Sequence, residues 1–479
     1  MILAALATLA IVVQDHTPLR AAPRSSATEL TELWQGDLLE IRSEHADYLQ
    51  VYNTRNERAG YLKSESVRPI SLTEADAPTL LTVLRFLRET PGSEALGISY
   101  GAAYLKAAPP QALTAEPFDA IARMAERLAD RASANPSNPT ATASPHPEIE
   151  QHIEVIQQFG IHLRTFERNN RMQVCYDGDL FRRVLTMPSA TPEQRAQATL
   201  ALTRPDCIDP DLGPLPRASL DEERSNLLDT LDERQLTPLT QSRLHARRAT
   251  VWASLTYEHA RRGTSPSEPA QRALAELLAV HPNDLGDDRR PEYLDAVLRV
   301  AAIRWAATTP PSTPSGTLVL RSTPGEPGQT CLTLEETQPH PGPDPTKPLV
   351  QRCTYGIVWN ASAKPLQHPP ALVLAVQPLD SWLELWVFHK KANTWTLDVL
   401  SPGTTDPDEG YIEFAGLTPN THHLLIAREL KDRGHYRRYF EELRLDDLAL
   451  IHQATTPELL PTFGRWQDIS WRRDTLALH

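Results

Sequence analysis

The spacing of hydrophobic side chains changes twice along this chain, and no other feature constrains its architecture as strongly. From residue 17 to 70, short segments alternate between apolar and polar residues, as expected for half-buried strands. From 72 to 307 apolar residues recur at helical spacing, and from 316 the alternation typical of strands returns. A chain of 479 residues is too long for a single hydrophobic core. We therefore expect a multidomain α+β protein.

The N-terminus carries a run of twelve residues, Ile2 to Val13, in which all but Thr8 are apolar. The run is too short to span a bilayer and matches the apolar region of a signal peptide. We therefore interpret residues 1–14 as a signal-like segment, which favours an exported protein, periplasmic or secreted, without a membrane span in its mature chain. A buried first strand or helix is the alternative, because no Lys or Arg precedes the run and short apolar runs have no unique structure.

The four cysteines agree with export. They are even in number and form no C-x-x-C pair, so a zinc site is not indicated. The expected domains favour two local disulfides, Cys175–Cys207 and Cys331–Cys353. Free buried thiols are the alternative, and a reducing compartment would favour them.

The first strand-rich module carries a recurring set of short motifs. In chain order these are Leu19-Arg20, Gly36-Asp37, Tyr48-Leu49-Gln50-Val51, Gly60-Tyr61-Leu62 and Val67. Residues 17–70 thereby resemble a bacterial SH3-like (SH3b) domain, although Tyr48 and Tyr61 stand where that family usually has Trp. The resemblance implies a small β-barrel that targets an exported protein to cell-wall polymer or to envelope proteins. A barrel that only packs on its neighbour is the alternative, since a fold alone carries no function.

The rest of the chain is predicted in four parts. Residues 72–133 form a helical segment, 134–147 a Pro/Ser/Asn-rich linker, and 148–307 a helical domain, either a bundle or a helical-repeat array. Residues 316–479 form a β-rich domain. Within it, two stretches of about fifty residues weakly resemble TolB- and WD40-like propeller blades at residues 355–452. A sandwich is the alternative for this domain.

One pentapeptide, Gly97-Ile98-Ser99-Tyr100-Gly101, has the G-x-S-x-G pattern of a serine-hydrolase nucleophile elbow. Such an elbow needs a strand before the serine and a helix after it. Here the preceding residues indicate a helix end, a turn and a new helix start, so the two glycines are expected to allow close helix packing. A serine hydrolase acting on envelope material through Ser99 remains the alternative function.

The sequence gives little indication of a metal site, a cofactor site or a nucleic-acid-binding surface. Asp177 and Asp179 are too few for a Ca²⁺ site, and His422-His423 have no acidic partners at ligand spacing. No cofactor-binding loop is present, so no cofactor is expected. The net charge is −13 and the basic residues are interspersed with acidic ones, so nucleic acid is not an expected partner.

Aromatic residues give the strongest binding signal. Trp34, Tyr48, Tyr52 and Tyr61 are dense for so small a module, and some must face outward, where aromatic rings anchor ligands. We therefore expect a non-catalytic exported envelope protein that binds cell-wall polymer or protein partners through this module and its helical surface.

Overall fold

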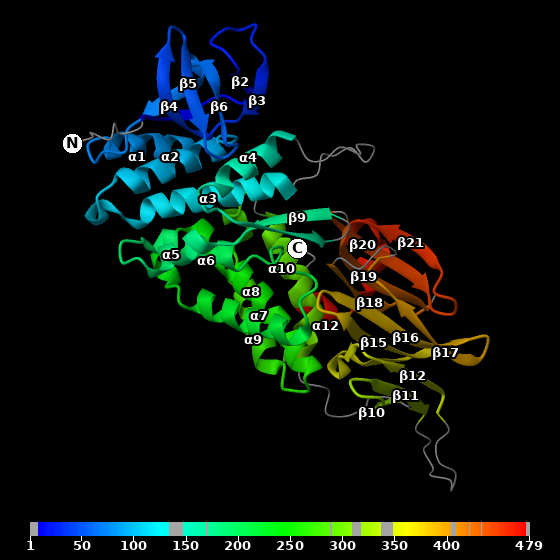
Figure 1. The fold of residues 1–479 in the computed structure, drawn as a ribbon. Coiled ribbons are helices and arrows are strands. Elements are labelled where there is room, and N and C mark those ends of the chain that lie inside the picture. Colours follow the sequence, from blue (N-terminus) through cyan, green and yellow to red (C-terminus); the bar gives the residue numbers. More distant parts are fainter. Residues whose placement is uncertain are drawn as a thin grey trace. The chain divides into compact units, whose positions relative to one another are not determined.

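The computed structural model describes residues 8–133, 147–168, 171–287, 290–308, 318–336, 348–403, 409–420, 422–432 and 434–475. The chain is a mixed α+β protein, as expected, with an N-terminal antiparallel sheet, a helical middle and β-rich sheets towards the C-terminus (Figure 1). It divides into two compact units, Met1–Gly213 with Thr230–Leu236, and Pro214–Asp229 with Thr237–His479. The linker predicted at 134–147 lies, except for its last residue, outside the described residues.

The first unit begins with a seven-stranded antiparallel sheet in the order β3-β2-β6-β5-β4-β1-β7. Its strands are β1 (Thr8–Val12), β2 (Thr17–Arg20), β3 (Glu29–Leu33), β4 (Leu38–His45), β5 (Tyr48–Asn53), β6 (Arg58–Lys63) and β7 (Val67–Ile70). Strands β3 and β7 end this order and do not pair with each other among the described strands. The described strands therefore form a sheet with two edges and not a closed barrel.

Strand β1 comes from the segment that was interpreted as signal-like. Its register pairs Ala10 with Leu39 and with Pro69, and Ala10, Ile11 and Val12 have no exposed surface. The alternative of a buried first strand therefore holds for Thr8–Val12, whereas residues 1–7 lie outside the described part of the chain. The physical reason is that β1 lies between β4 and β7 and pairs with both of them, so the sheet begins before residue 17.

A helical layer follows the sheet in the first unit. Its elements are α1 (Ala77–Arg88), α2 (Glu94–Ala107), α3 (Ala115–Ser133), α4 (Pro147–Gln157), the hairpin β8 (Leu163–Arg168) and β9 (Arg171–Tyr176), α5 (Asp179–Thr186) and α6 (Pro192–Leu202). The turn before β4 contacts α2 closely. A Cβ on Gly36, whose φ is +94°, would lie 2.7 Å from the carbonyl oxygen of Ala95. The following Asp37 is fully buried and accepts from Arg55 Nε at 2.8 Å, so the Gly-Asp motif has a structural role.

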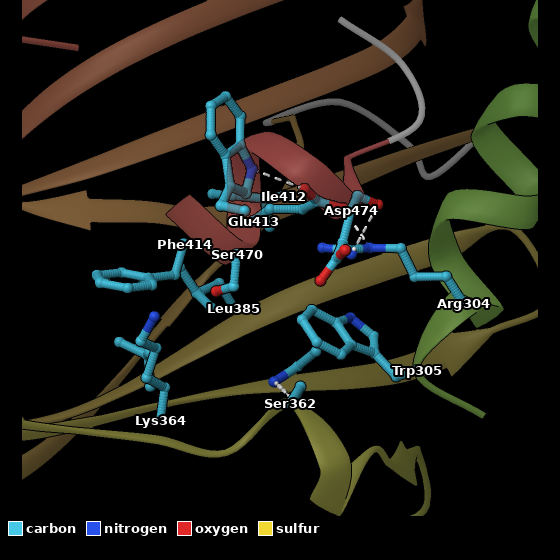
Figure 2. Close-up of a pocket in the computed structure, with 13 residues that line it drawn as sticks. Arg304, Trp305, Ser362, Lys364, Leu385, Ile412, Glu413, Phe414, Ser470 and Asp474 are labelled. Atoms are coloured by element: carbon cyan, nitrogen blue, oxygen red, sulfur yellow. Dashed lines mark hydrogen bonds and ion pairs between the residues drawn. The ribbon is translucent and has the colours of Figure 1, made fainter. Parts of the chain in front are cut away.

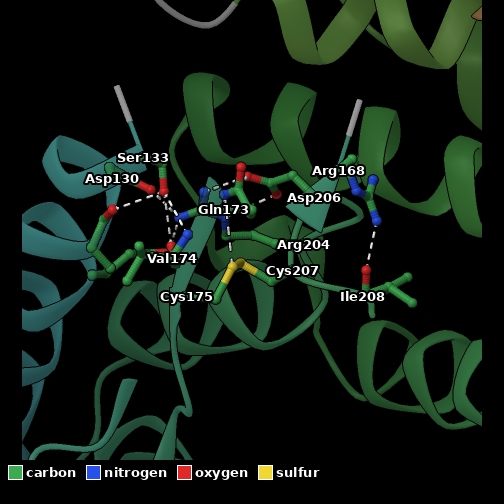
Figure 3. The surroundings of a disulfide bond; sticks show 12 residues. Asp130, Ser133, Arg168, Gln173, Val174, Cys175, Arg204, Asp206, Cys207 and Ile208 are labelled. Carbon is green, nitrogen blue, oxygen red and sulfur yellow. Dashed lines mark hydrogen bonds and ion pairs between the residues drawn. A yellow bond between two sulfur atoms is a disulfide. The ribbon is translucent and has the colours of Figure 1, made fainter. Parts of the chain in front are cut away.

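The first predicted disulfide, Cys175–Cys207, is present and joins β9 to the loop after α6 (Figure 3). Arg204 in this loop pairs with Asp130 of α3 at 2.7 Å and with Asp206 at 2.5 Å. Figure 3 shows these groups on both sides of the sulfur bridge. The loop is therefore fixed by one covalent bond and by charge-assisted hydrogen bonds.

The second unit combines helices with two sheets. Its elements are α7 (Pro214–Asp229), α8 (Pro238–Arg261), α9 (Ser267–Leu278), α10 (Arg290–Ile303), β10 (Leu318–Pro324), β11 (Thr330–Glu336), β12 (Val350–Thr354), β13 (Ile357–Val358), β14 (Lys364–Gln367), β15 (Pro370–Leu379), β16 (Trp382–Lys391), β17 (Thr394–Leu400), β18 (Glu409–Leu417), β19 (His423–Asp432), β20 (His435–Arg444), β21 (Leu450–Ala454), α11 (Pro461–Trp466) and α12 (Ile469–Asp474). Strands β10–β12 form one sheet, which the second predicted disulfide, Cys331–Cys353, crosses between β11 and β12.

The larger sheet runs in the order β13-β15-β16-β18-β19-β20-β21, with β14 on β15 and β17 on β16. The two predicted repeats are thus two antiparallel groups within one sheet, joined by the parallel pair β16–β18. Strand β15 is buried along Ala371–Gln377, which explains why its sequence is a continuous apolar run and not an alternating one. Leu374 packs with the β10–β12 sheet, whereas Ala375 packs with the helices.

The helices of this unit share their core with the larger sheet. Ala253 of α8 and Val297 of α10 belong to one buried cluster with Leu383 and Tyr411 of the sheet. Helices α7 to α10 are therefore grouped with the β-rich region and not with α1 to α6. The boundary predicted between residues 307 and 316 does not coincide with this division, because amphipathic helices and the sheet they cover form a single core.

Among the described residues, no helix is both long and apolar enough to cross a membrane.

Candidate functional site

Three of the four predicted binding residues lie together on the outer face of β5 and β6. Tyr48 and Tyr52 are four residues apart on β5, and Tyr61 on β6 pairs with Gln50 between them. Because alternate strand residues point to opposite faces, all three tyrosines project from the same side, and each is half-buried. The alternate residues are buried in the core of the sheet: Leu49, Val51 and Leu62.

Polar side chains fill the spaces between these rings. Ser43 Oγ donates to Gln50 Oε1 at 2.8 Å and contacts His45 Nε2 at 2.9 Å. The His45 ring lies edge-on to Tyr61 at 5.4 Å between ring centroids. The rings and these hydroxyl, amide and imidazole groups form what we call the tyrosine face. From Tyr48 to Tyr52 it extends about 13 Å, at about 3.3 Å per strand residue.

The cations around the tyrosine face are each matched by a carboxylate. Arg42 lies 5.6 Å from the Tyr52 ring centroid and pairs with Glu40 at 2.7 Å. Lys63, opposite Tyr48 in the register, pairs with Glu65 at 3.1 Å. The face therefore offers aromatic surface and hydrogen-bonding groups without a large excess of charge, which suits an uncharged polar ligand.

Trp34, the fourth predicted binding residue, does not join this face. Its side chain is 6% exposed and packs with Leu84, Ala95 and Ile98. The rings of His16 and His152 lie edge-on to it, at 4.5 and 6.2 Å between centroids. Trp34 is therefore a core residue of the first unit, and a ligand contact by Trp34 stays an untested prediction.

Ser99 lies inside α2 and not at a strand-to-helix turn. Its hydroxyl is 2% exposed and donates to the carbonyl oxygens of Gly36 at 2.6 Å and Ala95 at 2.9 Å. The flanking glycines serve packing, as expected: a Cβ on Gly97 would lie 2.3 Å from Met124 Sδ. The contacts of Gly97 and Ser99 inside the unit therefore explain the G-x-S-x-G pattern by packing.

Metal-ligating side chains do not gather in the described part of the chain: no group of three or more His, Cys, Asp and Glu could hold an ion there. Asp177 Oδ1 accepts from the backbone N–H of Asp179 at 3.2 Å at the start of α5. His423 Nδ1 contacts Glu442 at 2.8 Å. Both groups have local structural partners.

A buried charge cluster, not expected from the sequence, lies between α10 and the larger sheet. Arg299 of α10 pairs with Glu409 of β18 and, at 3.1 Å, with Asp380. Asp295, one turn earlier, shares a hydrogen bond with Glu409 and accepts from Tyr436 Oη at 2.6 Å. Burial, and secondarily the negative charge of Asp295, raises the pKa of Glu409 to about 7.

This raised pKa predicts a pH-dependent stability. Folded Glu409 retains its proton from its ordinary pKa of 4.5 up to about 7, so the native state binds more protons than the unfolded state across that window. The free energy of unfolding should therefore fall as pH rises through it, by on the order of 2–3 kcal/mol. All tryptophans except Trp34 lie in the second unit. Urea unfolding followed by tryptophan fluorescence therefore measures the free energy of unfolding of that unit.

The matched variant is Glu409→Gln, which cannot ionise and keeps the side-chain shape. The difference in unfolding free energy between wild type and Glu409→Gln should change between about pH 5 and pH 8. A difference that is constant over this range would contradict the assignment of the shift to Glu409.

Comparison of the chain with protein-family models, with curated proteins and with solved structures gives no significant match. Functional assignment therefore depends on the geometry of the chain itself.

Proposed function

We propose that this chain is a non-catalytic exported protein that binds cell-wall material through the tyrosine face. One observation carries the proposal: Tyr48, Tyr52 and Tyr61 are held half-exposed on one rigid face with hydrogen-bonding groups between them. Sugar rings present apolar C–H faces flanked by hydroxyl groups, and this face offers the complementary pattern of aromatic and polar groups. Rigid tyrosines also lose little conformational entropy on binding.

The disulfides support export. Both disulfides are formed, and disulfides persist in oxidising compartments such as the periplasm. A periplasmic or secreted location is part of the proposal. An envelope protein is the second ligand class, because aromatic surfaces of this size also anchor peptides.

The test is co-sedimentation of the full-length protein with purified cell-wall sacculi. Replacing Tyr48 and Tyr61 together with Ala should weaken retention at least about tenfold, since each removed aromatic anchor costs on the order of 1 kcal/mol or more. Phe86→Ala is the matched control, because Phe86 is a 70% exposed aromatic of the same unit away from the face. Circular dichroism checks that all variants fold.

Equal retention of the tyrosine double variant and of Phe86→Ala would refute binding through the tyrosine face. Retention of one protein from envelope extract, with none on sacculi, would reassign the ligand to the second class.

The alternative of a serine hydrolase has no supporting contact around Ser99 in the part of the chain that the structure describes. Ser99→Ala should leave retention on sacculi unchanged and lower the free energy of unfolding by about 1–2 kcal/mol, because two backbone carbonyls lose a buried donor. If the wild type hydrolysed an envelope ester or amide substrate and Ser99→Ala did not, the hydrolase alternative would be supported.

A further inference from the structure

The two disulfides differ in how far solvent reaches them. Cys175 is 1% exposed, and Cys207 is half-buried in a loop that ion pairs hold in place. In the second bond Cys331 is 8% exposed, whereas Cys353 is an exposed residue. Thiol–disulfide exchange requires access to one of the two sulfur atoms. The second bond is therefore the more open of the two to a thiol in solution.

The Cys331–Cys353 bond lies on the outer face of the sheet formed by β10, β11 and β12. The two cysteines are directly opposite each other in the register of β11 and β12. Leu332 and Leu334 of β11 are fully buried and pack with side chains of the larger sheet. Because successive strand residues point to opposite faces, the cysteines lie on the face away from this core. Opening the bond therefore does not require the core to open.

The position of β12 decides which sulfur a thiol reaches. Strand β12 is the last in the order β10-β11-β12 among the described strands. In exchange, a thiolate attacks one sulfur in line with the disulfide and the other sulfur leaves. Attack on Cys353 Sγ comes from the side opposite Cys331, which is the open edge of this sheet. Attack on Cys331 Sγ would come from the side of β10, so the geometry favours Cys353.

The sulfur that leaves has a hydrogen-bond acceptor beside it. Gln329 Oε1 lies 3.9 Å from Cys331 Sγ and accepts from the backbone N–H of Glu326 at 3.3 Å. The turn between β10 and β11 also covers Cys331, since a Cβ on Gly325 would lie 3.0 Å from its sulfur. After reduction, the Cys331 thiol can donate to Gln329 Oε1 and stays covered. Cys353 is then the outer thiol of the pair.

We propose that Cys331–Cys353 is a thiol–disulfide exchange site, which an external dithiol reduces in the folded protein while Cys175–Cys207 stays oxidised. One thiolate of the dithiol attacks Cys353 Sγ and forms a mixed disulfide, and Cys331 leaves as a thiolate that takes a proton from water. The second thiol of the dithiol loses its proton to water and attacks the dithiol's own sulfur in the mixed disulfide. Cys353 leaves as a thiolate and is protonated in turn. The dithiol thereby becomes a disulfide, and its two electrons reduce the protein bond to two thiols.

Contacts that do not depend on the bond should keep the second unit folded. Arg352 of β12 lies 5.1 Å from the ring centroid of Trp386 in the larger sheet. A cavity of about 70 Å³ between the larger sheet, the turn after α10 and α12 has neither cysteine in its described lining (Figure 2). At this cavity Arg304 Nε donates to Glu413 at 2.9 Å. Reduction of the disulfide should leave these contacts in place.

Dithiothreitol is the probe that tests the proposal. The full-length wild type is treated with dithiothreitol without denaturant and then alkylated, and peptide mass spectrometry follows both bonds. Reduction of Cys331–Cys353 should be at least about tenfold faster than reduction of Cys175–Cys207, because the buried bond becomes accessible only through local unfolding. The far-UV circular dichroism spectrum should stay unchanged while only the second bond is open. In urea that unfolds both units, the difference in rate should disappear.

Two matched variants test which sulfur is accessible. Cys331→Ser leaves Cys353 as a free thiol, and Cys353→Ser leaves Cys331. Iodoacetamide should modify Cys353 in the first variant at least about tenfold faster than Cys331 in the second, because exposed thiols react faster than covered ones.

Four outcomes would each overturn the proposal. In the wild type these are equal reduction rates of the two disulfides without denaturant, faster reduction of Cys175–Cys207, or opening of Cys331–Cys353 only in urea. In the variants it is modification of Cys331 at least as fast as that of Cys353.

Discussion

Glu413→Ala should lower the free energy of unfolding of the second unit by about 3–5 kcal/mol. The Glu413 carboxylate is 2% exposed and accepts from Arg304 Nε, from Trp471 Nε1 and, at 3.4 Å, from Thr475 Oγ1. The substitution leaves the 6% exposed Arg304 as a buried cation without its carboxylate. It also releases α12 from the sheet, because two of the lost bonds come from the C-terminal segment.

Urea unfolding followed by tryptophan fluorescence measures this loss. The matched control is the double variant Arg304→Met with Glu413→Leu, which removes both charges. It should lose much less stability than the single variant, since replacing a whole buried ion pair by apolar groups is often neutral. If the single variant unfolds at the wild-type urea concentration, Arg304 is solvated and Glu413 does not anchor α12.

Replacing Cys175 and Cys207 together with Ala should lower the free energy of unfolding of the first unit by about 3–4 kcal/mol. The two residues are 32 positions apart, so the bond removes much conformational entropy from the unfolded chain. Cys175 is 1% exposed on β9, and Arg204 and Asp206 beside Cys207 remain paired without the bond. The native fold should therefore persist in the variant at low temperature.

Calorimetry of the wild type and the variant measures the effect. Wild-type protein in strong reductant should reproduce the lowered transition, whereas the variant should not respond to reduction at this bond. An unchanged transition in both cases would mean that the Cys175–Cys207 bond does not constrain the unfolded state.

Local sequence patterns correctly predicted several parts of this structure. The strand, helix and strand regions follow from hydrophobic periodicity, which depends only on neighbouring residues. The β8–β9 hairpin, which lies inside the region predicted to be helical, is the exception. The placement of Ser99 in a helix and both disulfide pairs also match.

The errors concern long-range pairing. Nothing local in the apolar run ending at Val13 distinguishes a signal segment from β1, because its partners in β4 and β7 are distant in sequence. Likewise, helical periodicity shows that α7 to α10 bury one face but not which surface covers it. The helical and β-rich regions were therefore separated although they share a core.

The candidate site could be predicted in part. Strand alternation places Tyr48 and Tyr52 on one face, but it does not show that Trp34 turns inward. The buried Arg304–Glu413 pair was not predicted, although Glu413 and Arg304 each interrupt an otherwise apolar run. A charged residue in such a run needs a buried partner, and sequence alone does not identify that partner.

Hydroxyl-radical footprinting of the full-length protein tests binding at the tyrosine face most directly. Glycan fragments released from sacculi should reduce oxidation of Tyr48, Tyr52 and Tyr61. Two other exposed aromatics, Phe86 on α1 and the 50% exposed Tyr355 of the second unit, should be oxidised as before. Unchanged oxidation of the three tyrosines at glycan concentrations that saturate binding, or protection only elsewhere, would contradict binding at this face.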